Sequence, residues 1–283
     1  MIHPPLTGAA KLVTEESLFL ELNGERVFAF LHRPATDNGR GAVICAPLGE
    51  EMLWSRRVLV TFARELAAQG YAVLRFDYRG EGDSDRWFPE SDLSTRREDT
   101  SFAVDSLRRL VPATRDVTLV GLRLGASIAA AVAAEREDIR QLVLWDPVVD
   151  GADYMQTVLR SNLMFQMAQH RKVVENRDQL VERLRRGDTI NVEGYELGAS
   201  LFDQVSALRL PDVLNRFKGR SLLVSIPPRE APPRDNHATL AASCAGLAVL
   251  SATEEPFWRE IKTFYQRADR LFDATLGWLR NAS

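Results

Sequence analysis

The turn at residues 121–125, with the sequence GLRLG, carries the residue whose chemistry stands out most. It follows a short apolar run and precedes a segment rich in small residues, so it predicts a sharp strand-to-helix turn. Its central residue, Arg123, is permanently charged and cannot act as a nucleophile at ordinary pH. Beside the N–H groups of Leu124 and Gly125 at a helix start, its guanidinium would favour a carboxylate or a phosphate. The first hypothesis is therefore that Arg123 grips an anionic ligand group.

Several carboxylates stand on loops that one edge of a sheet would bring near Arg123. Glu255 and Asp146 are candidates for proton transfer, while Arg123 would stabilise charge in a non-covalent reaction. The alternative is internal, because a buried arginine needs a partner and Glu255, Asp146 or Glu50 could neutralise Arg123. The sequence leaves both hypotheses open.

Other residue types that carry chemistry give weaker signals. His170 lies in a charged stretch and is expected to be solvated, whereas His237 reaches the site only if the Pro-rich loop before it folds inward. Packing or loop closure explains Ser55, Ser84 and Ser127 better than a nucleophilic role. The sequence lacks metal-ligand spacing, a phosphate-binding loop and a dinucleotide fingerprint, so we predict neither a metal nor a cofactor.

Alternating strand and helix signals predict the elements that position these residues. Apolar runs bounded by turn residues predict strands, the first two joined by a hairpin at Asn23-Gly24. Apolar residues at helical spacing predict the helices between later strands. The predicted strands cover residues 17–22, 26–31, 42–46, 71–76, 117–120, 139–145, 221–226 and 247–251. The predicted helices cover residues 54–69, 97–110, 126–134, 236–244 and 257–279.

This alternation predicts an α/β fold with a mainly parallel central sheet, helices on both faces and ligands at the carboxyl ends of the strands. The alternation stops within the chain, so residues 1–150 and 212–283 form the predicted core and residues 151–211 a helical lid. Five apolar lid residues at helix-like intervals would either cover an acyl or other apolar ligand or pack on the core: Met155, Leu159, Leu163, Met164 and Met167.

The order of these elements, with G-x-x-x-G after a central strand and an insertion after the next strand, resembles the α/β-hydrolase fold over nearly the whole chain. Residues 77–84 (DYRGEGDS) also look like a loop of many of these hydrolases. Three further segments, 47–57, 121–126 and 144–151, resemble the hydrolase-like proteins associated with exosortase A systems. That group is related to serine aminopeptidase-type hydrolases and is found in bacterial exopolysaccharide gene clusters.

The departures from the hydrolase pattern concern the catalytic residues themselves. The family places a serine nucleophile where this chain has Arg123, and a histidine base in the loop after the last strand, where residues 252–258 contain none. Glu230 or Asp146 would stand in for the acid. We therefore predict a ligand-binding pseudohydrolase of an exopolysaccharide pathway rather than a Ser-His-Asp hydrolase. The alternative is an enzyme that works without a covalent intermediate, on an anionic or acyl substrate.

The resemblance also indicates which residues would line a pocket. Leu48, Gly49, Glu50 and Glu51 occupy the position of the hydrolase oxyanion loop, where the N–H of Leu48 or Gly49 would be the donor. The alternative for the two glutamates is an ion-pair cluster with the two arginines at positions 56 and 57. Aromatic residues at the same sheet edge would form either core or ligand platform: Trp145, Phe257 and Trp258.

Composition narrows the class of protein further. The 283 residues carry 36 basic and 39 acidic side chains, so a net charge of −3 gives no support for nucleic-acid binding by phosphate neutralisation. Two cysteines cannot form a disulfide scaffold. No apolar run is long enough to span a membrane, and residues 1–10 lack a secretory signal pattern, so we predict a cytoplasmic protein with a small-molecule ligand. The sequence does not predict the oligomeric state.

Overall fold

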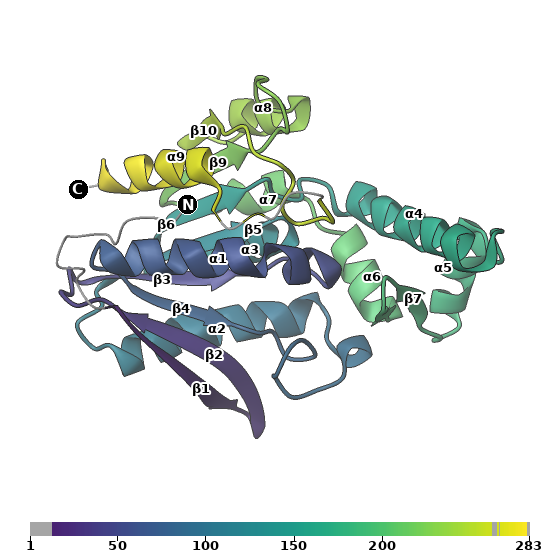
Figure 1. The fold of residues 1–283 in the computed structure, drawn as a ribbon, viewed down its shortest axis with the longest axis horizontal. Coiled ribbons are helices and arrows are strands. Elements are labelled where there is room, and N and C mark those ends of the chain that lie inside the picture. Colours follow the sequence, from purple (N-terminus) through teal and green to yellow (C-terminus); the bar gives the residue numbers. More distant parts are fainter. Residues whose placement is uncertain (1–12, 262–264, 266, 282–283) are drawn as a thin grey trace, which may run out of the picture.

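The computed structural model describes residues 13–261, 265 and 267–281, and Figure 1 shows their arrangement around one central sheet. Eight strands lie in the order β1-β2-β4-β3-β5-β6-β9-β10. The first two strands and the β2–β4 pair are antiparallel, and the other pairs are parallel. The strands are β1 (Thr14–Leu22), β2 (Glu25–Arg33), β3 (Arg40–Cys45), β4 (Ala72–Phe76), β5 (Asp116–Leu122), β6 (Ile139–Trp145), β9 (Arg220–Ser225) and β10 (Leu247–Ser251). This is the predicted α/β-hydrolase fold.

Helices cover both faces of the sheet. On one face α1 (Glu50–Ala68) and α9 (Asp269–Arg280) bury side chains against the strands. On the other face, α2 (Leu93–Leu110) and α3 (Leu124–Glu135) do the same, and α8 (Asp235–Ser243) contributes Leu240. A short 3-10 helix, η1 (Phe88–Glu90), precedes α2.

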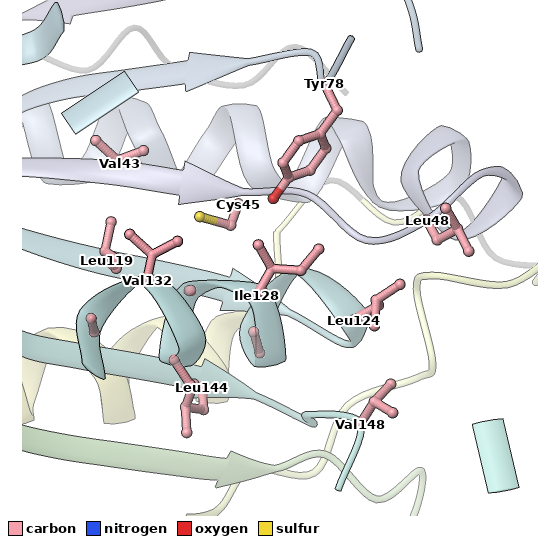
Figure 2. Packing of buried hydrophobic residues seen from close by; sticks show 14 of the residues in the cluster. Val43, Cys45, Leu48, Tyr78, Leu119, Leu124, Ile128, Val132, Leu144 and Val148 are labelled. Atoms are coloured by element: carbon pink, nitrogen blue, oxygen red, sulfur yellow. The ribbon is translucent and has the colours of Figure 1, made fainter. Parts of the chain in front are cut away.

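The buried small residues of α3 explain why this helix can approach the sheet closely. Four alanines, Ala126, Ala129, Ala130 and Ala133, are nearly inaccessible to solvent. Figure 2 shows Ile128 and Val132 of α3 among strand side chains such as Val43, Leu119 and Leu144. Because short side chains let backbones approach, α3 holds the turn before it firmly against the sheet edge.

The segment between β6 and β9 leaves the core at the carboxyl ends of the strands, beyond the sheet at the right of Figure 1. Met155 and Leu159 are fully buried, whereas Met164 and Met167 are 70% and 49% exposed, so the predicted apolar stripe divides between core and surface. The elements of this segment are α4 (Gly151–His170), α5 (Arg177–Arg185), β7 (Ile190–Val192), β8 (Tyr195–Leu197), α6 (Ala199–Ser206) and α7 (Leu210–Leu214). The strands β7 and β8 form a separate antiparallel hairpin.

Helix starts are where the structure departs most from the sequence prediction. Helix α1 begins at Glu50 rather than at residue 54, and α2 begins at Leu93 because the Asp92 carboxylate accepts a hydrogen bond from the N–H of Thr95. The last helix begins at Asp269, so the prediction of a helix from residue 257 is wrong. Part of that predicted range, residues 262–264 and 266, lies outside the described residues.

Two further findings bear on the class of protein. Cys45 and Cys244 are both buried, and neither forms a disulfide. Among the helices of residues 13–261 and 267–281, none combines the length and the apolar character that crossing a membrane requires.

Candidate functional site

The turn between β5 and α3 has the strained geometry of a nucleophile elbow, with an arginine at its centre. Arg123 adopts φ 54° and ψ −122°, a backbone region that side chains other than glycine rarely occupy. The flanking glycines explain how the turn fits. A Cβ at Gly121 would lie 2.4 Å from Ala126 Cα, and one at Gly125 would lie 2.3 Å from the carbonyl oxygen of Ala46. The predicted sharp turn is therefore present, and both glycines are needed for its packing.

The Arg123 guanidinium is neutralised by two carboxylates of the protein. Its Nε lies 3.2 Å from Glu51 Oε1, and its Nη1 lies 3.1 Å from Asp146 Oδ2 and 3.1 Å from the Asp146 carbonyl oxygen. The side chain is 12% exposed. Burial alone would lower the pKa of Arg123, but the two carboxylates outweigh burial and hold that pKa above its ordinary value. Arg123 is thus neutralised internally, by Asp146 as one of the three expected partners and by Glu51 in place of Glu50 or Glu255.

Asp146 is the most enclosed member of this ion cluster. Its carboxylate is fully buried and also lies 3.2 Å from Nη2 of Arg234. The N–H of Ile226 donates to its Oδ1 at 3.2 Å. Two guanidinium groups and a backbone N–H thus surround this carboxylate.

Aromatic rings complete the surroundings of Arg123. Its Cζ lies 5.8 Å from the ring centre of Tyr154 and 5.5 Å from that of Trp258. The Tyr154 hydroxyl donates a hydrogen bond to Glu51 Oε2 at 3.1 Å. No sequence pattern indicated Tyr154, because its contacts depend on where α4 docks.

The loop that would supply an oxyanion donor is occupied by an internal contact. The N–H of Gly49 donates to Glu81 Oε1 at 3.0 Å, and Nη2 of Arg96 lies 3.2 Å from the same oxygen. Both Glu81 and Arg96 are buried. This pair belongs to the residue 77–84 loop and to α2, and it uses the Gly49 N–H that the sequence proposed as an oxyanion donor.

A cavity of about 630 Å³ adjoins the ion cluster, between the oxyanion loop and the inserted segment. Its lining combines apolar side chains with four glutamates and two arginines: Glu50, Glu51, Glu193, Glu260, Arg160 and Arg259. Glu193 sits in the turn between β7 and β8, and partial burial together with a hydrogen bond to Glu50 raises its pKa to about 7. The apolar lining consists of Leu48, Phe88, Val158, Met164, Val192, Leu197 and Trp258.

The predicted pocket residues divide into two groups. Leu48, Gly49, Glu50 and Glu51 line the cavity as expected. The other three predicted ligand contacts are fully or almost fully buried and do not line it: Leu124, Trp145 and Phe257.

Two of those three residues are core aromatics. Trp145 packs between the rings of Phe62 and Phe272, and its indole N–H donates to Thr275 Oγ1 at 3.0 Å. Phe257 meets the ring of Trp258 edge to face, with ring centres 5.3 Å apart, and stacks on the ring of Tyr265. Of the two alternatives for these positions, core packing is the arrangement found.

Glu255, predicted as a proton-transfer group or partner of Arg123, needs correction. It is exposed, and the contacts that the structure gives Arg123 do not include it. Its neighbour Glu254 turns inward instead and accepts hydrogen bonds from the N–H groups of Arg270 and Leu271. Consecutive side chains in this loop point in different directions, and the sequence alone did not show which one faces inward.

The expected ion-pair cluster at the start of α1 also differs in detail. Glu51 pairs with Arg123, whereas Arg56 lies 3.3 Å from Asp77 Oδ1. Glu51 and Arg56 are five residues apart and lie on different sides of α1, so their side chains reach different loops.

The serine and histidine positions behave as structural residues. The hydroxyls of Ser55, Ser84 and Ser127 each donate to a backbone carbonyl oxygen. His237 does fold inward and is buried near Asp146 and Arg123, and burial lowers its pKa. Arg123 nevertheless takes the place of any hydroxyl that this imidazole could activate. Within the described part of the chain, no three metal-binding side chains gather as a metal ion would require.

The sheet order and the elbow define the class of protein as one with an α/β-hydrolase fold. Est1E from Butyrivibrio proteoclasticus, solved with ferulic acid, shares this fold with a TM-score of 0.70 and 17% identity, over 93% of this chain and 98% of that one. The esterase domain of a Rhodothermus marinus protein gives a TM-score of 0.65 and 19% identity, over 95% and 98% of the two chains.

The family is narrower than the fold. The serine aminopeptidase S33 family matches residues 35–194, more than half of the chain, and the chain belongs to that family. Quorum-quenching protein AidA of Acinetobacter baumannii (strain MDR-ZJ06) is 30% identical over 133 residues, which are 46% of this chain. The match spans 42% of the length of AidA.

Proposed function

We propose that this chain is a pseudohydrolase that binds a small molecule in the cavity beside Arg123 and does not cleave it. The observation that carries the proposal is the elbow itself, where Arg123 is fixed between Glu51 and Asp146 at 3.2 and 3.1 Å. Acyl transfer through a serine needs a nucleophile, a base and free oxyanion donors. The elbow side chain is an arginine and cannot act as the nucleophile. The Gly49 N–H, a candidate oxyanion donor, is already bonded to Glu81.

The cavity supports a ligand with an apolar body and a neutral, hydroxyl-bearing head. Seven of the eighteen residues that line it have apolar side chains, which suits an acyl chain. Arg123 is neutralised internally, and four glutamates line the cavity against two arginines, so the lining does not favour an anionic group. Glu50 and Glu193 would instead accept hydrogen bonds from hydroxyl groups. The segment 151–211 acts as the lid in this proposal, since its residues Val158 and Met164 line the cavity.

Binding of octyl glucoside, followed by calorimetry below its micelle concentration, tests the ligand half of the proposal. Octanoate is the matched anionic probe, and we expect it to bind more weakly. Val158→Trp fills the cavity and should weaken octyl glucoside binding by about tenfold or more. Val174→Trp, at a lid position that is 54% exposed, is the control and should leave binding unchanged. Tighter binding of octanoate would contradict the neutral head, and equal effects of the two variants would contradict the cavity.

A fluorophosphonate probe tests the catalytic half. We expect no covalent labelling and no turnover of short-chain esters. Labelling of any serine, together with ester turnover, would overturn the pseudohydrolase proposal even if the cavity binds ligand.

A second candidate is an enzyme with non-covalent acid–base chemistry, favoured by one observation. The pKa of Glu193, raised to about 7, suits proton transfer near neutral pH. This candidate assigns the proton transfer to Glu193 and Glu50 rather than to Asp146 or Glu255. A reaction found for the wild type and abolished in Glu193→Gln, with ligand binding retained, would establish it.

The proposed pathway and location follow from the motif resemblance and the sequence. We propose a role in making or exporting a bacterial exopolysaccharide, carried out in the cytoplasm. A strain that lacks this chain should lose extracellular polysaccharide. Unchanged polysaccharide yield in that strain would contradict the pathway assignment.

A further inference from the structure

A second cavity lies at the opposite edge of the sheet from the elbow. It has a volume of about 890 Å³ and is bordered by the amino-terminal ends of β5, β6 and β9. Its remaining walls come from the end of α3 and from residues 216–219, before β9. We call it the basic groove, because six cationic side chains line it against two acidic ones: Arg40, Arg136, Arg140, Arg216, Lys218 and Arg220 against Asp116 and Glu137.

Three of these cations already contact other side chains of the protein. Arg136 pairs with Asp105 and Asp138, and it also follows the last residue of α3. Arg220 stacks on the ring of Trp278, with its Cζ 4.9 Å from the ring centre. Arg40 bonds to the hydroxyl of Tyr71 at 3.3 Å. Packing and helix capping therefore account for this half of the positive charge.

The other three cations have no such explanation. Arg140, Arg216 and Lys218 are exposed, and the ion pairs among the described residues include none of them. Arg140 stands in β6, whereas the other two precede β9, so two chain segments bring their charges to one concavity. Phe217, between Arg216 and Lys218, adds an aromatic wall.

We propose that the basic groove binds a small molecule carrying two or more phosphate groups. Concentrated positive charge without internal partners attracts anions, and a concave site focuses that field. Arginine offers paired N–H donors to phosphate oxygens and lysine a compact charge, so this set suits phosphate well. The volume exceeds that of a single phosphate and leaves room beside Phe217 for a flat apolar group. The groove and its ligand are independent of the cavity beside Arg123.

Calorimetric titration of the full chain with inorganic tripolyphosphate and with ATP, in about 0.15 M KCl, tests this inference. We expect submillimolar binding of both probes. The double variant Arg140→Gln/Arg216→Gln should weaken both by about tenfold or more, since the two lost charge contacts together contribute about one order of magnitude. The matched control is Arg171→Gln/Lys172→Gln at an exposed lid corner, which should leave both affinities within about twofold of wild type.

Several outcomes would overturn the proposal. One is the absence of tripolyphosphate binding at this salt concentration. Another is equal weakening by the control variant, which would indicate only the general charge of the molecule. A third is binding of a long polyanion such as polyglutamate without binding of tripolyphosphate. Thermal unfolding of each variant, measured alongside, distinguishes a lost ligand contact from a lost fold: weakened binding counts only where the variant melts as the wild type does.

Discussion

The ion cluster of Arg123, Glu51 and Asp146, here called the floor, adjoins the cavity, and the glutamate pair Glu50 and Glu193, here called the rim, lines it; the two differ in how their charges are arranged. On the floor, Arg123 meets Glu51 and Asp146, and each buried charge faces its opposite. At the rim, the carboxyls of Glu50 and Glu193 face each other, and the pKa of Glu193 rises to about 7 as a result of partial burial and this contact. Burial makes an unpaired charge costly, so each charge of the floor needs an opposite charge beside it, whereas at the rim the raised pKa of Glu193 lets this side chain hold a proton beside Glu50.

The largest expected effect comes from removing the charge at the centre of the floor. Asp146→Asn leaves Arg123 and Arg234 without their shared buried carboxylate, and the free energy of unfolding should fall by about 3–5 kcal/mol. Urea denaturation measures the loss. The double variant Asp146→Leu/Arg123→Met removes both charges and should be more stable than Asp146→Leu alone. If the double variant is the less stable of the two, charge compensation is not what holds the floor together.

Arg123→Ser sharpens the same comparison by placing a nucleophile at the elbow. We expect a loss of about 2 kcal/mol, smaller than for Asp146→Asn, because Asp146 keeps Arg234 and the Ile226 N–H as partners. We also expect no gain of ester turnover, since residues 252–258 supply no base. Turnover above that of wild type in this variant would mean that another group, such as His237, serves as the base.

Tyr154→Phe tests the link between the floor and helix α4 with a smaller change. It removes one hydrogen bond, from the hydroxyl to Glu51 Oε2, while the ring beside Arg123 remains. The expected loss is about 1 kcal/mol of unfolding free energy. Tyr195→Phe, at the cavity wall, is a suitable control because the hydrogen bonds found for the described residues do not include its hydroxyl. Equal losses in both variants would show that the bond to Glu51 adds nothing.

The rim gives the smallest effect and the one that depends on pH. Since the folded-state pKa of Glu193 is raised from 4.5 to about 7, its contribution to stability is fully present below about pH 4.5 and is lost as pH rises through about 7. Relative to Glu193→Gln, the wild type should thus lose stability between about pH 5 and pH 8, by less than about 1 kcal/mol because the side chain is exposed. Glu196→Gln, on the neighbouring strand, should follow the wild-type profile. A wild-type profile parallel to that of Glu193→Gln would contradict the shared proton.

The fold and the elbow were predictable from the sequence because both rest on local patterns. Apolar runs bounded by turn residues predicted every strand of the central sheet within a few residues. Gly121 and Gly125 indicated the elbow in the sequence. The structure shows the reason, since only a hydrogen atom fits where a Cβ would stand at either position.

The partners of Arg123 were not predictable in the same way. Of Glu50 and Glu51, the second points toward the elbow, whereas of Glu254 and Glu255 the first turns inward. A shift of one residue thus decides which of two neighbouring glutamates faces inward. Helix α1 begins one turn earlier than its apolar spacing indicates, and this turns Glu51 toward the elbow. The direction of Glu51 and the position of Tyr154 both depend on how helices dock on the sheet, and no local sequence pattern predicts docking.

The ion cluster at the elbow is also a mechanical tie. Through Glu51, Asp146 and Arg234, the Arg123 side chain fastens α1, the end of β6 and the loop after β9 to the β5–α3 turn. A tie of this kind lets the loops at this edge of the sheet open only together, at the cost of breaking several buried contacts at once. Residues of α4 and of the β7–β8 hairpin line the adjoining cavity, so the inserted segment shapes this cavity next to loops that the tie holds together.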